Sequence, residues 1–473
     1  MKELLVMTFM VPIIGSFCLP LVSRFSAKLR NALSLVFVMT AFICSSALLP
    51  EVVAGRATML RLELPLGLSF GFLADGLAVF MACVSSFVGA IIVIYSFTYI
   101  DEPDHQGEYY LMVTLFIGAM MGLVYSTNMV FLYLFWEISA ICCWRLIGFR
   151  RHPDYILRAD KAFLITVFGA LVMFLGLLLV YQQTSTFELT AMSGVQLSSL
   201  SVLCIMVGLM SKSATLPLHS WLPDAGVAPA SVTSLLHAAV LVKIGVYAYA
   251  RLFLVTFDIA AVWHQVVPIV AAVSALVTAG VAIRENDLKR IIAYSTVSQI
   301  AFIFLGLSTG SLLGAAGGLL YILMHSLAKG GLFLCAGIVE HATHTKDLNQ
   351  LGGLYKTMPV TAACFLVCSL SVMGVPPFGG FFSKYMVIAG AVQAEQPWVA
   401  AVFVVGAVLT VVYLLRAFNA VFLGEERTPA HEGSRSMLAC VASLSGLSLI
   451  GGLLIAFPAS FVLDVVSRMG GLY

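Results

Sequence analysis

Four lysines and one glutamate lie within strongly apolar stretches of this chain. They are Glu137 in FLYLFWEISAICCW, Lys212 in CIMVGLMSKSATLP, Lys243 in LLHAAVLVKIGVYAYA, Lys329 in LLYILMHSLAKGGLFL, and Lys384 just after VPPFGGFFS. A charge at the centre of a bilayer costs at least ~2.5–3.5 kcal/mol on insertion scales. Five such charges, each in its own apolar segment, indicate that the chain uses them. The simplest use is to move protons or small ions along a buried charged row.

Glu137 and Lys212 are predicted to act as a pair. Glu137 is the one carboxylate well inside an apolar segment. An unpaired buried carboxylate takes up a proton, whereas a nearby ammonium group keeps it ionised. Lys212, from a different segment, is the natural partner. The alternative is a static ion pair that only fixes packing, but such pairs are poor stabilisers.

Two histidines accompany two of the lysines. His325 precedes Lys329 by four residues, which places both on one helix face, and His237 precedes Lys243 by six. Because histidine titrates near neutrality, it can relay protons between lysines. The alternative for each histidine is a hydrogen-bonded residue of the protein core.

Lys384 is the candidate for the point where the ion leaves the row, because it follows a segment rich in glycine and proline. The alternative is a lysine whose long side chain reaches the membrane interface. Ser298 and Gln299, in YSTVSQIAF, are weaker candidates for holding water near the row.

Composition identifies the class of protein. Of the 473 residues, 61% are hydrophobic and only 10% are charged, against about 25% charged residues in a soluble domain. This combination predicts an integral membrane protein. A net charge of +2 gives no indication of nucleic-acid binding. The ten cysteines form no C-x-x-C pattern, so we expect no metal, iron–sulfur cluster or haem in this chain.

The elements that must position the charges are membrane-spanning helices. Apolar windows of roughly 20 residues predict about fourteen spans in an all-α polytopic protein. The first window is better explained as a helix than as a signal peptide, because Glu3 lies in its n-region and no clear cleavage site follows. The windows lie near 4–23, 32–50, 74–98, 109–126, 128–148, 160–182, 197–216, 230–251, 260–283, 288–308, 312–339, 358–390, 397–423 and 437–463.

The basic residues of the loops predict the orientation. With both termini on the non-cytoplasmic side, 15 Lys and Arg residues fall on the cytoplasmic side and 5 on the other. Cytoplasmic loops carry such an excess of positive charge. The asymmetry therefore supports both an even number of spans and a multi-pass protein of the cell's inner (cytoplasmic) membrane.

The seventh and twelfth spans are predicted to be broken. The seventh meets Pro217 and Pro223 just after Lys212, and the twelfth contains GVPPFGG before Lys384. Proline removes a backbone donor and clashes with the preceding turn. Breaks at membrane depth persist only where protein or water satisfies the freed carbonyl groups.

The two breaks favour an inverted repeat, because paired broken helices beside midplane sites are typical of transporters. We expect helices 1–3 over residues 1–108, a first repeat of helices 4–8 over 109–251, a second repeat of helices 9–13 over 252–423, and helix 14 over 424–473.

The sequence segments that contain these residues resemble those of a known family. KSATLPLHSWLPDAGVAPASVTSLLHAAVLVKIGVYAYAR is similar to the central signature of the antiporter-like, proton-conducting membrane subunits shared by respiratory complex I, Mrp-type antiporters and membrane-bound hydrogenases. ENDLKRIIAYSTVSQIAFIFLGL, HSLAKGGLFLCAG, GVPPFGGFFSKYM and FWEISAICCWRLIGF extend the likeness over roughly residues 70–420.

The resemblance implies fourteen helices in two inverted half-channels. It implies an ion pair of Glu137 with Lys212, a central axis of Lys243, His325 and Lys329, and Lys384 as the terminal lysine. ITVFGA and MHSLAKGGLF are closer to Mrp and hydrogenase relatives than to the distal complex I subunit.

The resulting prediction is a proton- or sodium-translocating subunit of a redox-driven membrane complex, without a redox centre of its own. Iron–sulfur clusters with nickel or flavin are expected in partner subunits, namely a peripheral redox arm beside related antiporter-like membrane subunits. Alternatives are a subunit of an Mrp-type sodium/proton antiporter and a membrane partner in inorganic-carbon uptake. A transporter of organic solutes is disfavoured, because the breaks lack an aromatic or asparagine-lined cluster.

Overall fold

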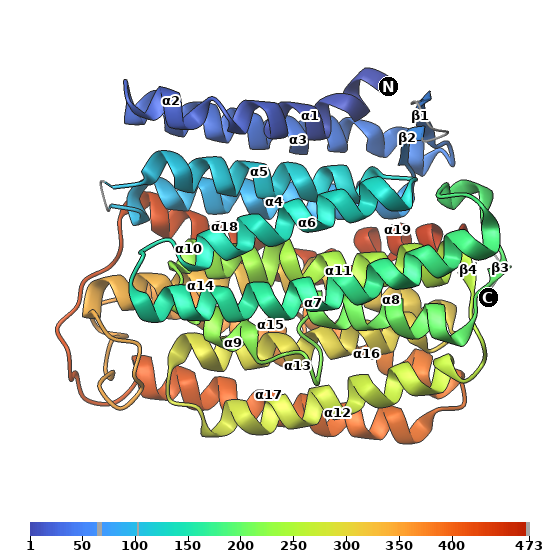
Figure 1. Ribbon diagram of the computed structural model, residues 1–473. Coiled ribbons are helices and arrows are strands. Elements are labelled where there is room, and N and C mark those ends of the chain that lie inside the picture. The colour runs from blue at the N-terminus through green and yellow to red at the C-terminus, as the bar shows by residue number, and fades with distance from the viewer. Residues whose placement is uncertain (64–68, 102–103, 470–473) are drawn as a thin grey trace. The chain divides into compact units, whose positions relative to one another are not determined.

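The computed structural model describes residues 1–63, 69–101 and 104–469 and is almost entirely helical (Figure 1). Among these residues, eleven helices are long and apolar enough to cross a membrane, and three further apolar helices are shorter. The prediction of an all-α polytopic membrane protein is therefore confirmed. The windows 4–23, 197–216 and 358–390 are the ones in which no single long helix forms.

The contacts within the chain divide it into two compact units. Unit 1 comprises Met1–Val93, Ile100–Lys212 and Ala239–Ala260. Unit 2 comprises Ile94–Tyr99, Ser213–Ala238 and Ala261–Tyr473.

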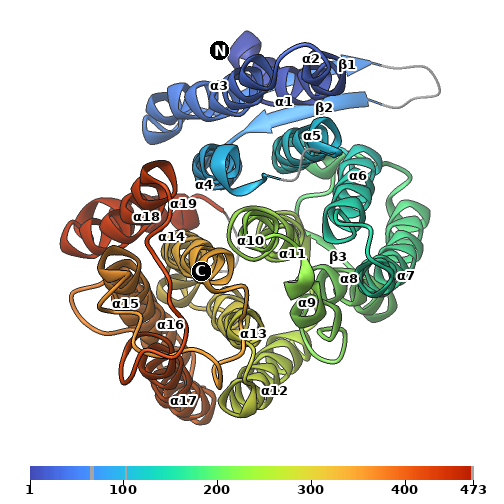
Figure 2. The same ribbon diagram turned by 90° about the vertical axis from the view of Figure 1, so that its left-hand side faces the viewer.

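Unit 1 carries the N-terminal helices and the first candidate charges. In Figure 2, α1, α2 and α3 lie together beside the pair α4 and α5. Its helices are α1 (Lys2–Ser16), α2 (Leu19–Ser23), α3 (Ala27–Val53), most of α4 (Gly76–Tyr99), α5 (Gln106–Tyr125), α6 (Met129–Ile147), α7 (Pro153–Thr184), the short η2 (Leu189–Ala191), α8 (Ser199–Lys212), α11 (Leu241–Ala250) and the π-helical η5 (Arg251–Thr256).

Short strands in unit 1 were not predicted from the sequence. β1 (Thr58–Glu63) and β2 (Ser69–Ala74) form an antiparallel pair between α3 and α4. β3 (Val195–Gln196) and β4 (Phe257–Asp258) pair in parallel. Both pairs lie outside the long helices, and their strands of two to six residues are too short for a window of about 20 residues to resolve.

Unit 2 carries the remaining helices. In Figure 2, α13 lies beside α12 and α14, with α15, α16 and α17 near them. The elements are α9 (Trp221–Asp224), η3 (Ala225–Val227), α10 (Ala230–Ser234), the π-helical η4 (Leu235–Ala239), α12 (Trp263–Arg284), α13 (Leu288–Ser308), α14 (Leu312–Thr343), α15 (Pro359–Met373), α16 (Gly379–Gln393), α17 (Pro397–Phe422), α18 (Arg435–Leu453) and α19 (Ala456–Ser467).

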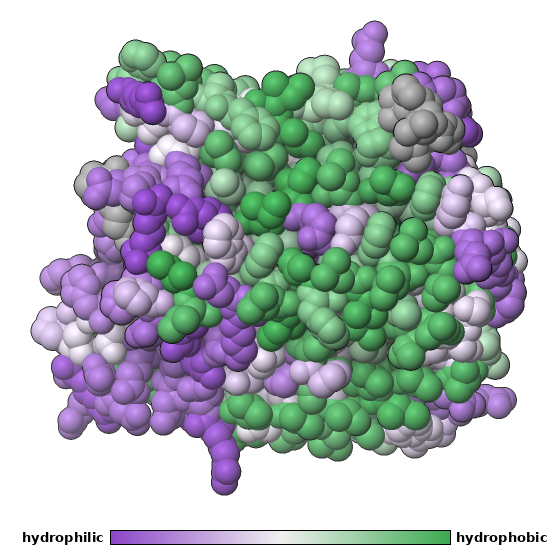
Figure 3. Space-filling model, in the orientation of Figure 1, coloured by the Kyte–Doolittle hydropathy of each residue, from purple (hydrophilic) through white to green (hydrophobic). Residues whose placement is uncertain are grey.

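Apolar side chains cover the outward faces of the long helices. On the face shown in Figure 3, they cover most of α7 and α12, while hydrophilic side chains gather toward the helix ends. Leu164, Leu171 and Leu175 of α7 are each more than half exposed. Such surfaces suit lipid, where a helix satisfies its own backbone groups.

Both predicted breaks are present. The seventh window ends at Lys212, the last residue of α8, and the short helix α9 follows only at Trp221. The twelfth window ends its first half at Met373, and α16 resumes at Gly379. Between these last two helices Gly374 has φ +83°, a left-handed conformation that glycine adopts at no steric cost.

Two other windows differ from the expectation of continuous helices. The window 230–251 contains the π-helical turn η4 between α10 and α11, and π-turns inside helices frequently mark functional sites. The window 437–463 is interrupted after Leu453. Neither interruption could be predicted from apolar periodicity, because the residues on both sides are equally apolar.

Candidate functional site

Unit 1 brings Lys212 close to Glu137. Lys212 is fully buried at the end of α8, and its Nζ donates a hydrogen bond to the carbonyl oxygen of Trp136 at 3.0 Å. The ammonium also lies 5.2 Å from the centroid of the Trp136 ring and interacts electrostatically with Glu137. The helix break thus leaves the lysine where α6 presents a carbonyl group, an aromatic face and a carboxylate.

Glu137 is half-buried in the middle of α6. Its side chain shares a hydrogen bond with Tyr133, one helical turn earlier. Its Oε1 is buried and has no hydrogen-bond partner among the described residues. A buried carboxylate oxygen without a partner is expensive, and it is a ready acceptor for a proton or a water molecule.

Lys243 is fully buried in α11, which packs against α8 within unit 1. Tyr247 and Arg251 follow at intervals of four residues, so the three side chains share one helix face. Arg251 Nε donates to the Tyr247 hydroxyl at 3.0 Å, and its two terminal nitrogens donate to the carboxylate oxygens of Asp75 at 2.6 and 2.7 Å. A polar line therefore runs from Lys243 toward the end of α11.

A cavity of about 210 Å³ lies at that end of unit 1. Asp75 and Arg251 line it together with small hydroxyl side chains, among them Thr127, Thr190 and Ser193. Burial raises the pKa of the Asp75 carboxyl, but the charge and hydrogen bonds of Arg251 outweigh it and hold that pKa below its usual value. The cavity is thus lined by an ionised pair and by groups that bind water.

Unit 2 places Lys329 and His325 on one face of α14, as predicted. Both are fully buried. Lys329 Nζ donates to the carbonyl oxygen of Ile292 at 3.1 Å and to Ser295 Oγ at 2.6 Å, both on α13. The His325 ring meets the ring of Tyr321, one turn earlier, with centroids 5.9 Å apart.

His237 lies in the π-helical turn η4 rather than in a regular helix. It is fully buried, and its ring packs against Phe333 of α14 with centroids 4.3 Å apart. Within unit 2 it therefore contacts the same helix that carries His325 and Lys329.

Lys384 is buried in α16 and does not reach the surface. Its Nζ donates to the carbonyl oxygen of Val372, near the end of α15, at 2.7 Å. The ammonium lies 4.5 Å from the ring centroid of Phe302 and 5.6 Å from that of Tyr321. The break between α15 and α16 thus supplies the carbonyl group that the charge needs.

A group of polar side chains that the sequence analysis largely missed lies between Lys329 and Lys384. The Tyr321 hydroxyl donates to Gln299 Oε1 at 2.6 Å, and Gln299 Nε2 donates to the hydroxyls of Tyr413 at 3.4 Å and Thr410 at 3.2 Å. The Tyr413 hydroxyl donates to Ser295 Oγ at 2.7 Å. Of the two weaker candidates, Gln299 belongs to this group, whereas its neighbour Ser298 donates to the carbonyl oxygen of Ala275.

Lys289 is a second residue whose surroundings the sequence did not reveal. The 15 basic residues assigned to the cytoplasmic side include Lys289, but its side chain is buried at the start of α13. Its Nζ donates to Glu340 Oε2 at 2.9 Å and to the carbonyl oxygen of Ala228 at 2.7 Å. The sequence does not show this burial, because Lys289 lies at the edge of the apolar window 288–308.

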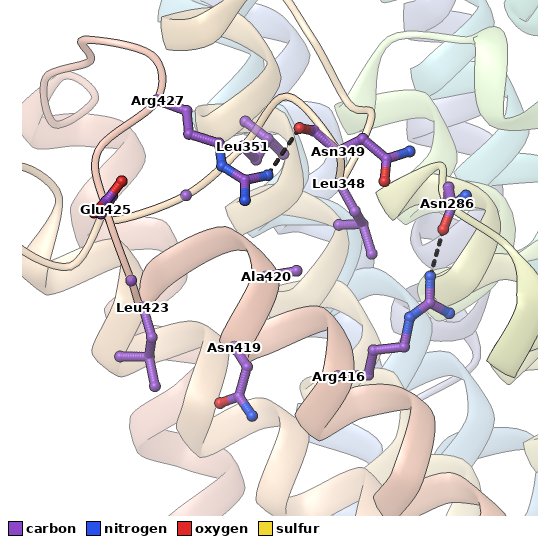
Figure 4. Close-up of a pocket in the computed structure, with 12 residues that line it drawn as sticks. Asn286, Leu348, Asn349, Leu351, Arg416, Asn419, Ala420, Leu423, Glu425 and Arg427 are labelled. Carbon is purple, nitrogen blue, oxygen red and sulfur yellow. Dashed lines mark hydrogen bonds between the residues drawn. The ribbon is translucent and has the colours of Figure 1, made fainter.

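A polar pocket of about 330 Å³ lies at the end of α17 (Figure 4). Arg416 donates to Asn286 at 2.6 Å, and Arg427 donates to the carbonyl oxygen of Asn349 at 2.9 Å. Both arginines belong to the 15 Lys and Arg residues that the charge count assigns to the cytoplasmic side. The pocket offers water a place at that end of unit 2.

Comparison with known proteins identifies the family. Residues 126–410, more than half of the chain, match the family described as NADH:quinone oxidoreductase/Mrp antiporter, transmembrane. Residues 64–110 match the N-terminus of chain 5 of NADH-ubiquinone oxidoreductase (complex I).

One curated relative is subunit A1 of the Na⁺/H⁺ antiporter of Staphylococcus aureus, which is 32% identical over 98% of this chain. The chain spans 62% of the length of that relative.

Solved structures share the fold. An Mrp complex from a Dietzia species contains a chain with a TM-score of 0.92 and 23% identity, covering 99% of this chain and 98% of that one. The archaeal membrane-bound sulfane sulfur reductase gives 0.90 and 21%, over 99% and 98%. Respiratory complex I of Thermus thermophilus gives 0.84 and 22%, over 99% and 100%. The chain belongs to the NADH:quinone oxidoreductase/Mrp antiporter family of membrane proteins.

Proposed function

We propose that this protein is an ion-translocating, antiporter-like subunit of a multisubunit membrane complex. The observation that carries the proposal is the burial of four lysines inside helices, each at most 4% exposed. Lysine is almost never buried without a role or a partner, and Lys212 and Lys384 both lie at helix breaks. Ions would move along Glu137, Lys212, Lys243, His237, His325, Lys329 and Lys384.

In unit 1, the Glu137–Lys212 pair would act as a switch. The partnerless Oε1 of Glu137 can accept a proton or a hydrogen bond from water, which weakens its hold on the Lys212 ammonium. Lys243, Tyr247 and the Asp75–Arg251 cavity would then form the opening of this unit on the non-cytoplasmic side.

In unit 2, Lys329 and His325 would pass the charge toward Lys384. Protons are the favoured ion, because rows of ammonium groups repel sodium and the polar side chains between the lysines bond directly to one another. The predicted inverted repeats, helices 4–8 and 9–13, would give each half of the chain one such path.

The parent complex is proposed to be redox-driven, with iron–sulfur clusters and nickel or flavin in partner subunits and no cofactor in this chain. It would lie in the cytoplasmic membrane, with both termini of this chain on the non-cytoplasmic side. A second candidate is an Mrp-type antiporter, which the 32% identity to the Staphylococcus aureus subunit favours. The inorganic-carbon alternative stays a prediction.

The metal content and partner masses of the purified complex test the parent assignment. Iron together with nickel or flavin supports the redox-driven complex. An assembly of small hydrophobic partners without these metals or flavin contradicts it and favours the Mrp antiporter.

A further inference from the structure

The hydrogen bonds between Lys329 and Lys384 have a direction. Starting at Tyr321, whose ring contacts the Lys384 ammonium, each group donates to the next: Tyr321 to Gln299 Oε1, Gln299 Nε2 to Tyr413, and Tyr413 to Ser295 Oγ. All four side chains are at most 1% exposed. Every donor therefore points from the Lys384 end toward Ser295.

Two donors converge on Ser295. Its Oγ accepts from the Lys329 ammonium at 2.6 Å and from the Tyr413 hydroxyl at 2.7 Å. A hydrogen bond from a charged donor is about twice as strong as a neutral one, and an oxygen that accepts from a cation becomes a better donor. A charged Lys329 therefore favours the reverse arrangement, in which Ser295 donates to Tyr413.

Only the amide of Gln299 can complete that reversal. Hydroxyl groups both donate and accept, so Ser295, Tyr413 and Tyr321 change direction by rotating an O–H bond. The amide must turn over, so that its oxygen faces Tyr413 and its nitrogen faces Tyr321. This turn exchanges two atoms of nearly identical size and moves no other heavy atom. Thr410 Oγ1 accepts from the Gln299 nitrogen while its own hydroxyl donates to the carbonyl oxygen of Gly406 at 2.8 Å. In the turned state this hydroxyl must leave Gly406 to donate to the Gln299 oxygen.

We infer that Gln299 is a positioning residue whose amide, by turning over, couples the charge of Lys329 to the hydroxyl of Tyr321 beside Lys384. The inference rests on the proposed function and names the connection between its last two lysines. With Lys329 neutral, the chain points toward Ser295; with Lys329 charged, it points toward Tyr321.

This hydrogen-bonded connection responds to the charge of Lys329 and does not select an ion by its size. It passes through direct side-chain bonds, so no hydrated cation travels along it. The titratable groups that face the amide are Tyr321 and Tyr413. Lys329 lies two hydrogen bonds beyond Tyr413, through Ser295, and His325 and Lys384 pack on Tyr321. Unit 2 would therefore carry protons.

The test compares Gln299→Met, Ser295→Ala and Tyr413→Phe with the control Ser308→Ala in the full complex. Gln299→Met keeps the length of the side chain but removes both polar atoms. Ser308 is the matched control, because it is buried on the same helix and its hydroxyl donates to the carbonyl oxygen of Leu305, away from the groups that Lys329 bonds. Lys384→Ala serves as the test of the proposed function itself.

Two quantities are measured in proteoliposomes: the maximal rate of proton transport and the proton concentration that gives half of it. The three chain variants are expected to lose about tenfold or more in maximal rate with an unchanged half-saturation, whereas Ser308→Ala keeps both. A glutamine side-chain amide band in the infrared difference spectrum after a pH step is expected to vanish in Gln299→Met and Ser295→Ala and to persist in Ser308→Ala.

The outcomes separate the two claims. In the first outcome, Lys384→Ala abolishes transport, the maximal rates of the three chain variants stay within twofold of that of the unmodified protein, and the amide band persists in Ser295→Ala. The coupling role of Gln299 is then wrong and the proposed function stands. If Lys384→Ala transports normally, the proposed function is wrong and the coupling falls with it. Loss of transport in Lys384→Ala and in the three chain variants supports both claims, provided that the control transports normally and the amounts of assembled complex are unchanged.

Discussion

At the residue scale, backbone carbonyl groups freed at breaks and on neighbouring helices surround the buried charges. Lys212 bonds Trp136, Lys329 bonds Ile292 and Lys384 bonds Val372, each through a main-chain oxygen. A carbonyl oxygen stabilises an ammonium group without fixing it as a full countercharge would. The lysines can therefore exist charged or neutral, which an ion path requires.

The identities of these lysines could be predicted from the sequence, because a charge inside an apolar window is conspicuous. Tyr321, Tyr413 and Ser295 could not, because tyrosine and serine are common in apolar helices. Only the packing of α13, α14 and α17 brings them together.

The Asp75–Arg251 pair gives a prediction for stability. Asp75→Asn leaves the buried Arg251 without its countercharge, so the free energy of unfolding should fall by about 3–5 kcal/mol. Glu51→Gln, which breaks the exposed pair with Arg56, should cost less than about 1 kcal/mol. Thermal unfolding of the purified complex measures both, and equal losses would contradict the assigned role of burial.

The same pair gives a prediction for pH. The folded-state pKa of Asp75 lies below its usual value of 3.8, so the pair contributes stability that is fully present above the unfolded pKa and is lost as pH falls through the folded pKa. Stability measured from pH 6 down to about 3 should fall more steeply in the unmodified protein than in Asp75→Asn. Parallel curves would show that the carboxyl is not held ionised.

At the element scale, the broken helices are the part of the fold that the sequence predicted best. Proline and glycine act locally, so their effect on a helix does not depend on distant contacts. The π-helical turn that contains His237 and the one that follows Ala250 could not be predicted, because they arise from packing and not from a local signal.

Gly374 tests the break between α15 and α16. Gly374→Ala forces a side chain into φ +83° and brings its Cβ to 3.1 Å from Lys384 Cδ, which should cost roughly 1–2 kcal/mol of stability and slow transport by displacing the lysine. Gly446→Ala is the control, because a Cβ there meets open space. A Gly374→Ala protein as stable and active as Gly446→Ala would show that the left-handed turn does not position Lys384.

At the scale of the whole molecule, the all-α membrane class followed from composition and apolar windows, while the short strands and the interruption after Leu453 did not. Hydropathy reports the average environment of about 20 residues and cannot resolve a break of two or three. The orientation of the termini is likewise a prediction from charge, and it has a direct test.

The loop residues Arg56 and Lys356 should lie on opposite sides of the membrane. Cysteines placed by Arg56→Cys and Lys356→Cys are both exposed. A membrane-impermeant thiol reagent added to intact cells should label the first and not the second, above the background of the native cysteines. Labelling of Lys356→Cys alone would invert the proposed orientation.

The central claim is that the buried lysines carry the ion, and proton flux through the purified complex in proteoliposomes tests it most directly. Lys212→Met and Lys384→Met should each reduce potential-driven proton flux by at least about tenfold, which corresponds to ~1.4 kcal/mol in the barrier. Lys356→Met removes an exposed lysine and should leave the flux unchanged. Normal flux in both buried-lysine variants, with the complex fully assembled, would contradict the account.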